Sequence, residues 1–208
     1  MSRAFRAVLL GAALWPVWAM AYDLTPPAGE VSHDEGLAAW ARIEAVVTHP
    51  RCANCHVGPD NIPMWTGPEY RQPGPHGSRI DGGESRMGAE TLLCSTCHVT
   101  SERPNTVPRA APHAGLDWRL APVEMQWFGL DGAAICAQLA DPARTGGRDG
   151  QGLAEHLAED AEHRGFVLWG WEPGPGRETP PGDVQAHIDD MLIWTAAGQP
   201  CPEPVGLP

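Results

Sequence analysis

Two copies of one five-residue pattern organise this chain: Cys94-Ser95-Thr96-Cys97-His98 and, earlier, Cys52-Ala53-Asn54-Cys55-His56. Both read C-x-x-C-H, which is the attachment signature of a c-type haem. Two thiols one turn apart can add to the two vinyl groups of one porphyrin, and the imidazole that follows can bind the iron. The sequence therefore predicts two covalently bound haem c groups. Their attachment residues are Cys52, Cys55, Cys94 and Cys97, and their proximal iron ligands are His56 and His98.

Two other kinds of site use the same cysteine spacing. Four thiolates in two C-x-x-C pairs can form a structural zinc site, and a single pair can be a thioredoxin-type redox centre. Neither explains why a histidine follows immediately in both copies, although histidine makes up only nine of the 208 residues. The pattern therefore favours haem.

The first 21 residues have the three parts of a secretory signal peptide. A basic segment with Arg3 and Arg6 is followed by an apolar run at residues 7–17 and by the small-x-small sequence Ala19-Met20-Ala21. The apolar run is shorter than the roughly 20 residues that a membrane-spanning helix needs, so we expect cleavage rather than an uncleaved anchor. The mature protein, residues 22–208, is then expected in the periplasm, which agrees with haem attachment after export, and without a membrane span.

The mature chain is acidic and rich in residues that favour loops. Cleavage would remove two of the 14 basic residues, all of them arginine, and leave twelve arginines against 26 acidic residues. This balance disfavours nucleic acid and anionic membrane surfaces as partners, and it suits docking to a basic patch on a redox protein. The 22 prolines and 24 glycines predict long irregular loops, so the two haems would supply part of the core.

Between these loops, apolar residues recur at helical spacing. The clearest helices are expected after Ser32, which stands at capping-box spacing from Glu35, and after Asp183. Further helices are expected at residues 87–93, 132–139 and 150–162. The two motifs are only 42 positions apart, too close to head two cytochrome domains. We therefore expect one mainly α domain over residues 22–208, in which cytochrome c-like helices and long irregular loops wrap around two neighbouring haems.

Two cysteines, Cys136 and Cys201, lie outside the haem motifs. In an oxidising compartment such a remaining pair favours a disulfide over two free thiols. The bridge would tie an expected helix to the C-terminal tail. On the chain-entropy model, closing a loop of this length stabilises a fold by roughly 4 kcal/mol.

Each haem iron has a sixth coordination position, whose occupant separates electron transfer from catalysis. His76, in the Pro-Gly loop between the motifs, is the candidate distal ligand of the first haem. Met125, in a Pro-anchored loop after the second motif, is the candidate for the second haem, where a thioether would raise the reduction potential. Met64 and His113 are the reserves, and His156 is a weaker candidate because its acidic neighbours suggest a solvated helix face.

Four further segments occur in the same order in a small family of dihaem c-type cytochromes. They are Leu120-Ala121-Pro122-x-x-Met125-x-Trp127, Asp141-Pro142-Ala143-Arg144-Thr145-Gly146-Gly147-Arg148, Trp169-Gly170-Trp171-x-Pro173-Gly174-x-Gly176-Arg177 and Cys201-Pro202. From about Cys52 to Pro202 the chain resembles this family, whose members are sometimes labelled isoquinoline 1-oxidoreductase subunits. The resemblance implies that the protein accepts electrons from a periplasmic oxidoreductase, such as a molybdenum hydroxylase.

These features predict an electron-transfer protein and not an enzyme. It would pass electrons between a redox enzyme and the respiratory chain, as a free carrier or as a subunit. No nucleophile paired with a base stands out, and Gly82-Gly83 and Gly146-Gly147 open no phosphate-binding helix after a strand, which argues against nucleotide binding. The alternative is a peroxidase-like haem enzyme in which one iron keeps an open position.

Overall fold

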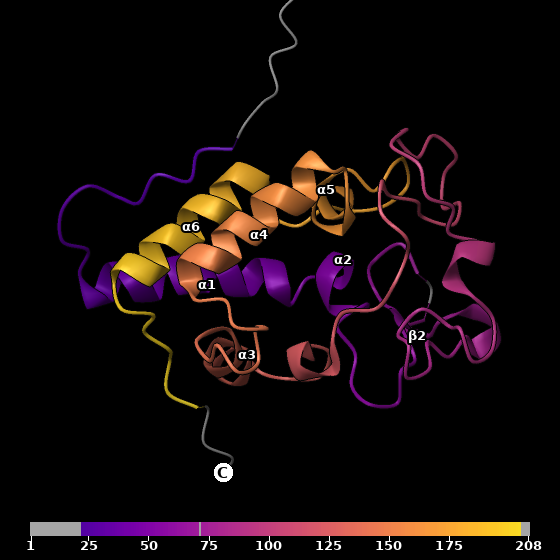
Figure 1. Cartoon of the computed structure of the whole chain (residues 1–208), viewed down its shortest axis with the longest axis horizontal. Helices are drawn as coiled ribbons and strands as arrows, with labels where there is room; N and C mark the ends of the chain where they lie inside the picture. Colours follow the sequence, from indigo (N-terminus) through magenta and orange to yellow (C-terminus); the bar gives the residue numbers. More distant parts are fainter. Residues whose placement is uncertain (1–21, 71, 205–208) are drawn as a thin grey trace, which may run out of the picture.

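The computed structural model describes residues 22–70 and 72–204, so the expected signal peptide lies outside the described residues. The described part is mainly helical, as predicted (Figure 1). Its helices are α1 (His33–Val47), α2 (Pro50–Ala53), α3 (Gly132–Leu139), α4 (Gly150–Glu162), α5 (Phe166–Trp171) and α6 (Val184–Ala196). Two short strands, β1 (Met64–Trp65) and β2 (Gly74–Pro75), pair antiparallel. Across these two described ranges, no helix is both long enough and apolar enough to cross a bilayer.

The helices α1, α4 and α6 pack together and form one half of the molecule (Figure 1). α1 begins with the expected capping box, in which the Ser32 hydroxyl accepts the N–H of Glu35 and the Glu35 carboxylate accepts the N–H of Ser32. Trp40 of α1 and Trp194 of α6 are almost fully buried, and their ring centroids lie 5.4 Å apart. The main apolar core therefore lies between these helices.

The predicted disulfide between Cys136 and Cys201 is confirmed, and it joins α3 to the segment that follows α6. Cys136 is completely buried. Close by, the indole N–H of Trp194 donates to the carbonyl of Pro200 (2.9 Å). The bridge and this hydrogen bond together fasten the C-terminal segment to the helical core.

The other half of the molecule is irregular, and it carries most of the loops seen at the right of Figure 1. The helix expected at residues 87–93 is absent from it. Gly88 has a φ of +74°, and the N–H of Cys94 donates to the carbonyl of Met87 (2.9 Å), so a turn closes across the expected helix. The helices expected at 132–139 and 150–162 are confirmed, whereas α5 has no counterpart in the sequence prediction.

Candidate functional site

Both cysteine motifs fold into the same single turn. In the first motif, which starts in α2, the N–H of His56 donates to the carbonyl of Cys52 (3.3 Å). In the second motif, a 3-10 turn precedes His98, whose N–H donates to the carbonyl of Cys94 (2.9 Å). Each histidine is therefore held one turn beyond the first cysteine, as attachment to a single porphyrin requires.

The two motif histidines make the same hydrogen bond to a backbone carbonyl. His56 Nδ1 lies 2.7 Å from the carbonyl oxygen of Met125, and His98 Nδ1 lies 2.8 Å from that of Pro112. A carbonyl can only accept, so Nδ1 carries the hydrogen in both rings and Nε2 keeps the lone pair that a metal ion needs. Burial lowers the pKa of both imidazoles, that of His56 to about 4, so this lone pair stays unprotonated at neutral pH.

A tryptophan stacks on each motif histidine. The ring centroids of His56 and Trp127 lie 3.4 Å apart and those of His98 and Trp118 lie 4.6 Å apart, with 5° and 13° between the ring planes. The stacked tryptophan fixes the tilt of the imidazole plane, and the carbonyl fixes the direction in which Nδ1 and Nε2 point. Sequence reasoning missed both roles, because neither tryptophan stands at a spacing from its motif that indicates contact.

The thiols of the first motif are partly buried. Cys52 and Cys55 are free, and burial raises the pKa of Cys52 to about 12 and that of Cys55 to about 11. Both residues nevertheless keep some accessible surface. They are therefore only partly covered by the protein, and Cys55 packs against an apolar cluster.

The second motif is flanked by exposed apolar side chains. Its Cys94 and Cys97 are also free, and Cys97 is exposed. Leu92, Leu93 and Val99 expose 45%, 50% and 55% of their surface. Large apolar side chains that gather at the surface mark a place where something covers them. A largely apolar group attached to these thiols would do so.

The two motifs approach each other through one small apolar cluster, formed by Ala114, Trp118 and Trp169. Cys55 of the first motif and Cys94 of the second both pack against it. The rings of Trp118 and Trp169 meet edge to face, with centroids 5.3 Å apart. Groups attached at the two motifs would therefore be neighbours.

The two candidate distal ligands lie at the opposite motifs from those expected. His76 lies beside His98 of the second motif, with ring centroids 6.0 Å apart. Met125 instead gives its carbonyl to His56 Nδ1, and its side chain is part of the main apolar core. A sulfur beyond an iron bound to Nε2 would lie about 9 Å from this carbonyl oxygen, but one methionine separates these two atoms by at most about 6 Å. This geometry disfavours Met125 as the distal ligand of the first haem.

The reserve candidate Met64 lies next to the first motif. Its N–H donates to the carbonyl of Asn54 (2.9 Å), the residue between the two cysteines of the motif. Together with Val57, Phe128 and their neighbours, Met64 also borders a hollow of about 420 Å³. Met64 therefore lies beside the first motif, whereas His76 lies at the second motif and Met125 contacts His56 through its backbone carbonyl.

Two further histidines lie near the motifs. His156 on α4 is close enough to His56 for its charge to contribute to the lowered pKa of that imidazole, after the larger effect of burial. His113 adjoins the apolar cluster in the sequence, and its Nδ1 is buried without a hydrogen-bond partner. His156 is nevertheless exposed, as its acidic neighbours in the sequence suggested.

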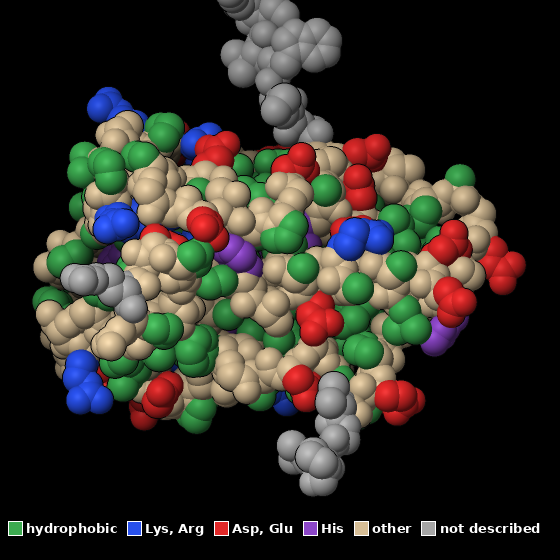
Figure 2. All heavy atoms as spheres, turned by 180° about the vertical axis from the view of Figure 1, so that it is seen from behind, with side chains coloured by type: hydrophobic (Ala, Val, Ile, Leu, Met, Phe, Trp, Pro, Cys, Tyr) green, Lys and Arg blue, Asp and Glu red, His purple; other side chains and the backbone are tan. Residues whose placement is uncertain are grey.

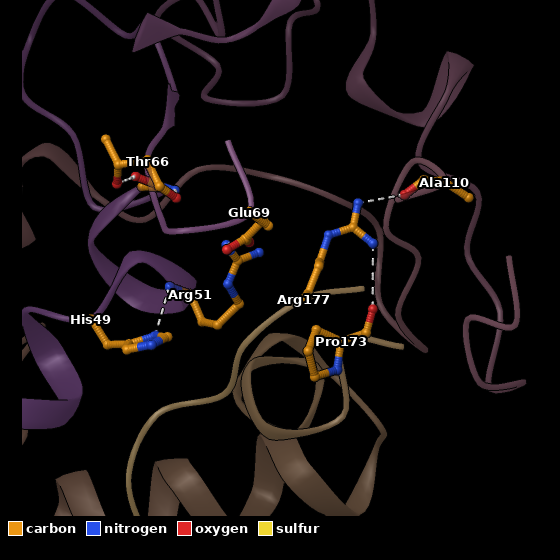
Figure 3. Close-up of polar contacts among 8 residues, drawn as sticks. His49, Arg51, Thr66, Glu69, Ala110, Pro173 and Arg177 are labelled. Atoms are coloured by element: carbon orange, nitrogen blue, oxygen red, sulfur yellow. Dashed lines mark hydrogen bonds and ion pairs between the residues drawn. The ribbon is translucent and has the colours of Figure 1, made fainter. Parts of the chain in front are cut away.

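Arg51, inside the first motif's helix, carries a buried charge close to both motifs. Its side chain pairs with Glu69 (Figure 3). Its guanidinium lies 5.8 Å from the centre of the Trp169 ring. The backbone N–H of Arg51 donates to Nδ1 of His49 (3.2 Å), and this hydrogen bond caps the N-terminus of α2. The start of the first motif is therefore anchored by the same arginine that lies over the shared aromatic cluster.

Arg177 holds two loops together near the second motif. Its guanidinium donates to the carbonyl oxygens of Ala110 (2.6 Å) and Pro173 (3.5 Å), as Figure 3 shows. Its positive charge also contributes to the lowered pKa of His98, after burial and the charge of His76. Arg177 thus adds a positive charge to the surroundings of His98.

Arg86 binds the segment after the first motif to the segment before the second. Its guanidinium donates to the carbonyl oxygens of Val57 (2.9 Å), Gly58 (3.1 Å) and Ala121 (2.8 Å) and to the side-chain oxygen of Asn61 (2.8 Å). All of these partners are neutral, so backbone and amide dipoles solvate the buried charge. The relative position of the two motifs depends on this residue.

Several buried donors near the motifs have no protein partner: Trp127 Nε1, Trp169 Nε1 and Arg51 Nε. A haem combines an apolar ring, which needs covering side chains, with two propionates, which accept hydrogen bonds. The free thiols, the Nε2 lone pairs, the exposed apolar rim of the second motif and these unpaired donors match that combination. The residues present therefore fit a haem at each motif.

Within the two described ranges, no three or more His, Cys, Asp or Glu side chains gather so that they could hold a metal ion by themselves. The four motif thiols therefore do not form the tetrahedral cluster that a structural zinc site needs.

Comparisons of the chain with family models, curated proteins and solved structures found no match.

Proposed function

We propose that this protein is a periplasmic dihaem c-type cytochrome that transfers electrons between a redox enzyme and the respiratory chain. The proposal rests on the repetition of one arrangement. In both motifs two free thiols precede a histidine whose Nδ1 is bound to a backbone carbonyl and whose Nε2 is free. A hydrogen bond of this kind keeps a metal-binding imidazole in one direction and makes it a better ligand.

In this proposal Cys52, Cys55, Cys94 and Cys97 attach the two haems, and His56 and His98 bind the irons. When bound, haem c supplies one-electron redox chemistry at each motif. The chain itself orients the imidazoles and places the Trp118–Trp169 pair between the motifs. It contributes no catalytic side chain.

The charge distribution supports a redox partner with a basic patch. The resemblance to the dihaem family implies a periplasmic oxidoreductase, such as a molybdenum hydroxylase, as that partner. Residues 50–122, which carry both motifs, contain seven arginines and seven acidic residues, whereas the rest of the mature chain contains five arginines and 19 acidic residues. Figure 2 shows many acidic side chains on the right-hand side, which is the helical half in this view from behind. A basic surface would be attracted to that half, mainly through a faster rate of association.

Counting covalent haems tests the proposal. We expect the full-length chain, produced with c-type haem maturation, to retain two haems after denaturation. Cys94→Ala/Cys97→Ala should retain one haem, while the matched control Cys136→Ala/Cys201→Ala should retain two. A wild-type polypeptide that carries no haem after denaturation would overturn the proposal.

The peroxidase-like alternative concerns the first haem, because Met125 offers its carbonyl on the proximal side there and its sulfur cannot reach the distal side. Electron transfer predicts that both haems are reduced and reoxidised reversibly without consumption of peroxide. Turnover of peroxide together with binding of carbon monoxide at the first haem would instead favour the enzyme.

A further inference from the structure

We propose that His76 is the distal ligand of the haem at the second motif, so that this iron is closed by two histidines, His76 and His98. The inference rests on the proposed function, since it assigns the sixth position of one of its two haems. It also differs from the sequence expectation, which paired His76 with the first motif.

The separation of the two rings fits ligation of one metal ion. Their centroids lie 6.0 Å apart, with 50° between the ring planes. Two imidazoles on opposite sides of one ion, with metal–nitrogen bonds of about 2.0 Å, place their centroids about 6.3 Å apart. The observed spacing is within a few tenths of an ångström of this value, and it is too long for direct stacking of the rings.

The hydrogen bonds of His76 leave the correct nitrogen free. Its Nδ1 lies 2.9 Å from the carbonyl oxygen of Gly77, so Nδ1 carries the hydrogen and Nε2 keeps its lone pair. His98 has the same arrangement with Pro112. Both imidazoles are therefore held in the tautomer that binds iron through Nε2.

The two-stranded ribbon holds His76 in position. β1 and β2 pair Met64 with Pro75 and Trp65 with Gly74, and the N–H of His76, which follows β2, donates to the carbonyl of Pro63 (2.7 Å). The Trp65 ring lies 5.1 Å from that of His76. It also packs so closely on Gly77 that a Cβ there would come within 2.6 Å of it.

The ribbon is in turn fastened to the first motif. Asn54 accepts the N–H of Met64 on its carbonyl (2.9 Å), its side-chain amide donates to the carbonyl of Thr66 (3.1 Å), and its side-chain oxygen accepts the Thr66 hydroxyl (2.6 Å). A residue between the first pair of cysteines thus positions a ligand for the second haem. This link makes the coordination of the second iron dependent on the fold of the first motif.

Carbon monoxide binding to the reduced full-length protein tests the assignment. We expect His76→Ala to bind about one equivalent more carbon monoxide per protein than the wild type, and added imidazole to reverse this gain. The matched control is His163→Ala. Its Nδ1 bonds a backbone carbonyl in the same way (Glu159, 2.8 Å), but its side chain is exposed on the helical half. It should bind as much gas as the wild type.

A spectroscopic measurement on the wild type covers the case in which His76→Ala does not fold. Near-infrared magnetic circular dichroism distinguishes bis-histidine from histidine–methionine ligation, and we expect a bis-histidine signal. The assignment is overturned if both haems are present but no such signal is seen, or if His76→Ala keeps two haems and binds no extra gas. A wild-type chain without covalent haem would instead overturn the proposed function itself.

Discussion

Removing the Cys136–Cys201 disulfide should cost the protein a large part of its stability. The two residues are 65 positions apart, and closing a loop of that length in the unfolded chain stabilises the folded state by about 4 kcal/mol on the chain-entropy model. The four haem-attachment cysteines all lie outside this loop, so the thioether bonds do not already restrict it. The full effect of the disulfide is therefore expected even when both haems are attached.

The perturbation is Cys136→Ala/Cys201→Ala, and the assay is guanidinium denaturation of the haem-loaded protein followed by far-ultraviolet circular dichroism. We expect a loss of about 4 kcal/mol in the free energy of unfolding, or a fall of roughly 10 °C in the melting temperature for a chain of this size. With the haem irons already reduced in both proteins, a thiol reductant should lower the stability of the wild type by a similar amount and leave that of the variant unchanged. Haem content and the optical spectrum should stay the same.

A loss of less than about 1 kcal/mol would refute this reasoning, because the C-terminal segment would then be held by packing alone. Its packing contacts are visible in the structure: the hydrogen bond from Trp194 to Pro200 and the close approach of Pro200 to Gly36 of α1. If the variant with its haem irons already reduced still loses stability in thiol reductant, another cysteine pair is responsible for the effect.

Three further predictions concern buried polar groups. Arg86→Leu leaves buried carbonyl oxygens without their donor, so denaturant titration should show a loss of at least about 3 kcal/mol, and a wild-type midpoint would contradict its bridging role. Burial lowers the pKa of His187 to about 4 from 6.5, so the unfolded chain binds more protons between these values. The unfolding free energy should therefore fall by about 3 kcal/mol as the pH drops from 6.5 to 4. His187→Gln should show a smaller fall over the same pH range, and an equal fall in the two proteins would show that His187 does not cause it. Asn54→Ala should lower the free energy of unfolding by about 1–2 kcal/mol, because its hydrogen bonds to Thr66 are lost. If the effects of Asn54→Ala and Thr66→Val simply add in a double-mutant cycle, these hydrogen bonds do not contribute to stability.

Several helices and the disulfide could be predicted from short-range patterns and from the cysteine count. The helix after Ser32 follows from a capping box, and the bridge between Cys136 and Cys201 follows from elimination of the motif cysteines. The prediction of a helix at residues 87–93 was wrong, because Gly88 has a positive φ and a turn closes between Met87 and Cys94. α5 was missed because six residues are too short for helical periodicity to show.

The two C-x-x-C-H turns, the helical framework and the acidic charge follow from the amino-acid sequence, because each depends on residues close together in the chain or on composition. The surroundings of each motif histidine, in contrast, arise from the folded arrangement of distant segments. The partners Met125 and Trp127 of His56 lie about 70 residues away from it, and the loops between them contain no periodic pattern that could report the contact. The position of His76 also depends on the folded arrangement. The ribbon that holds it is bonded to Asn54 of the first motif, but it places His76 next to His98 of the second motif. Loop paths are set by backbone hydrogen bonds and by packing against distant segments, so the pairing of ligands emerges only when the chain is folded.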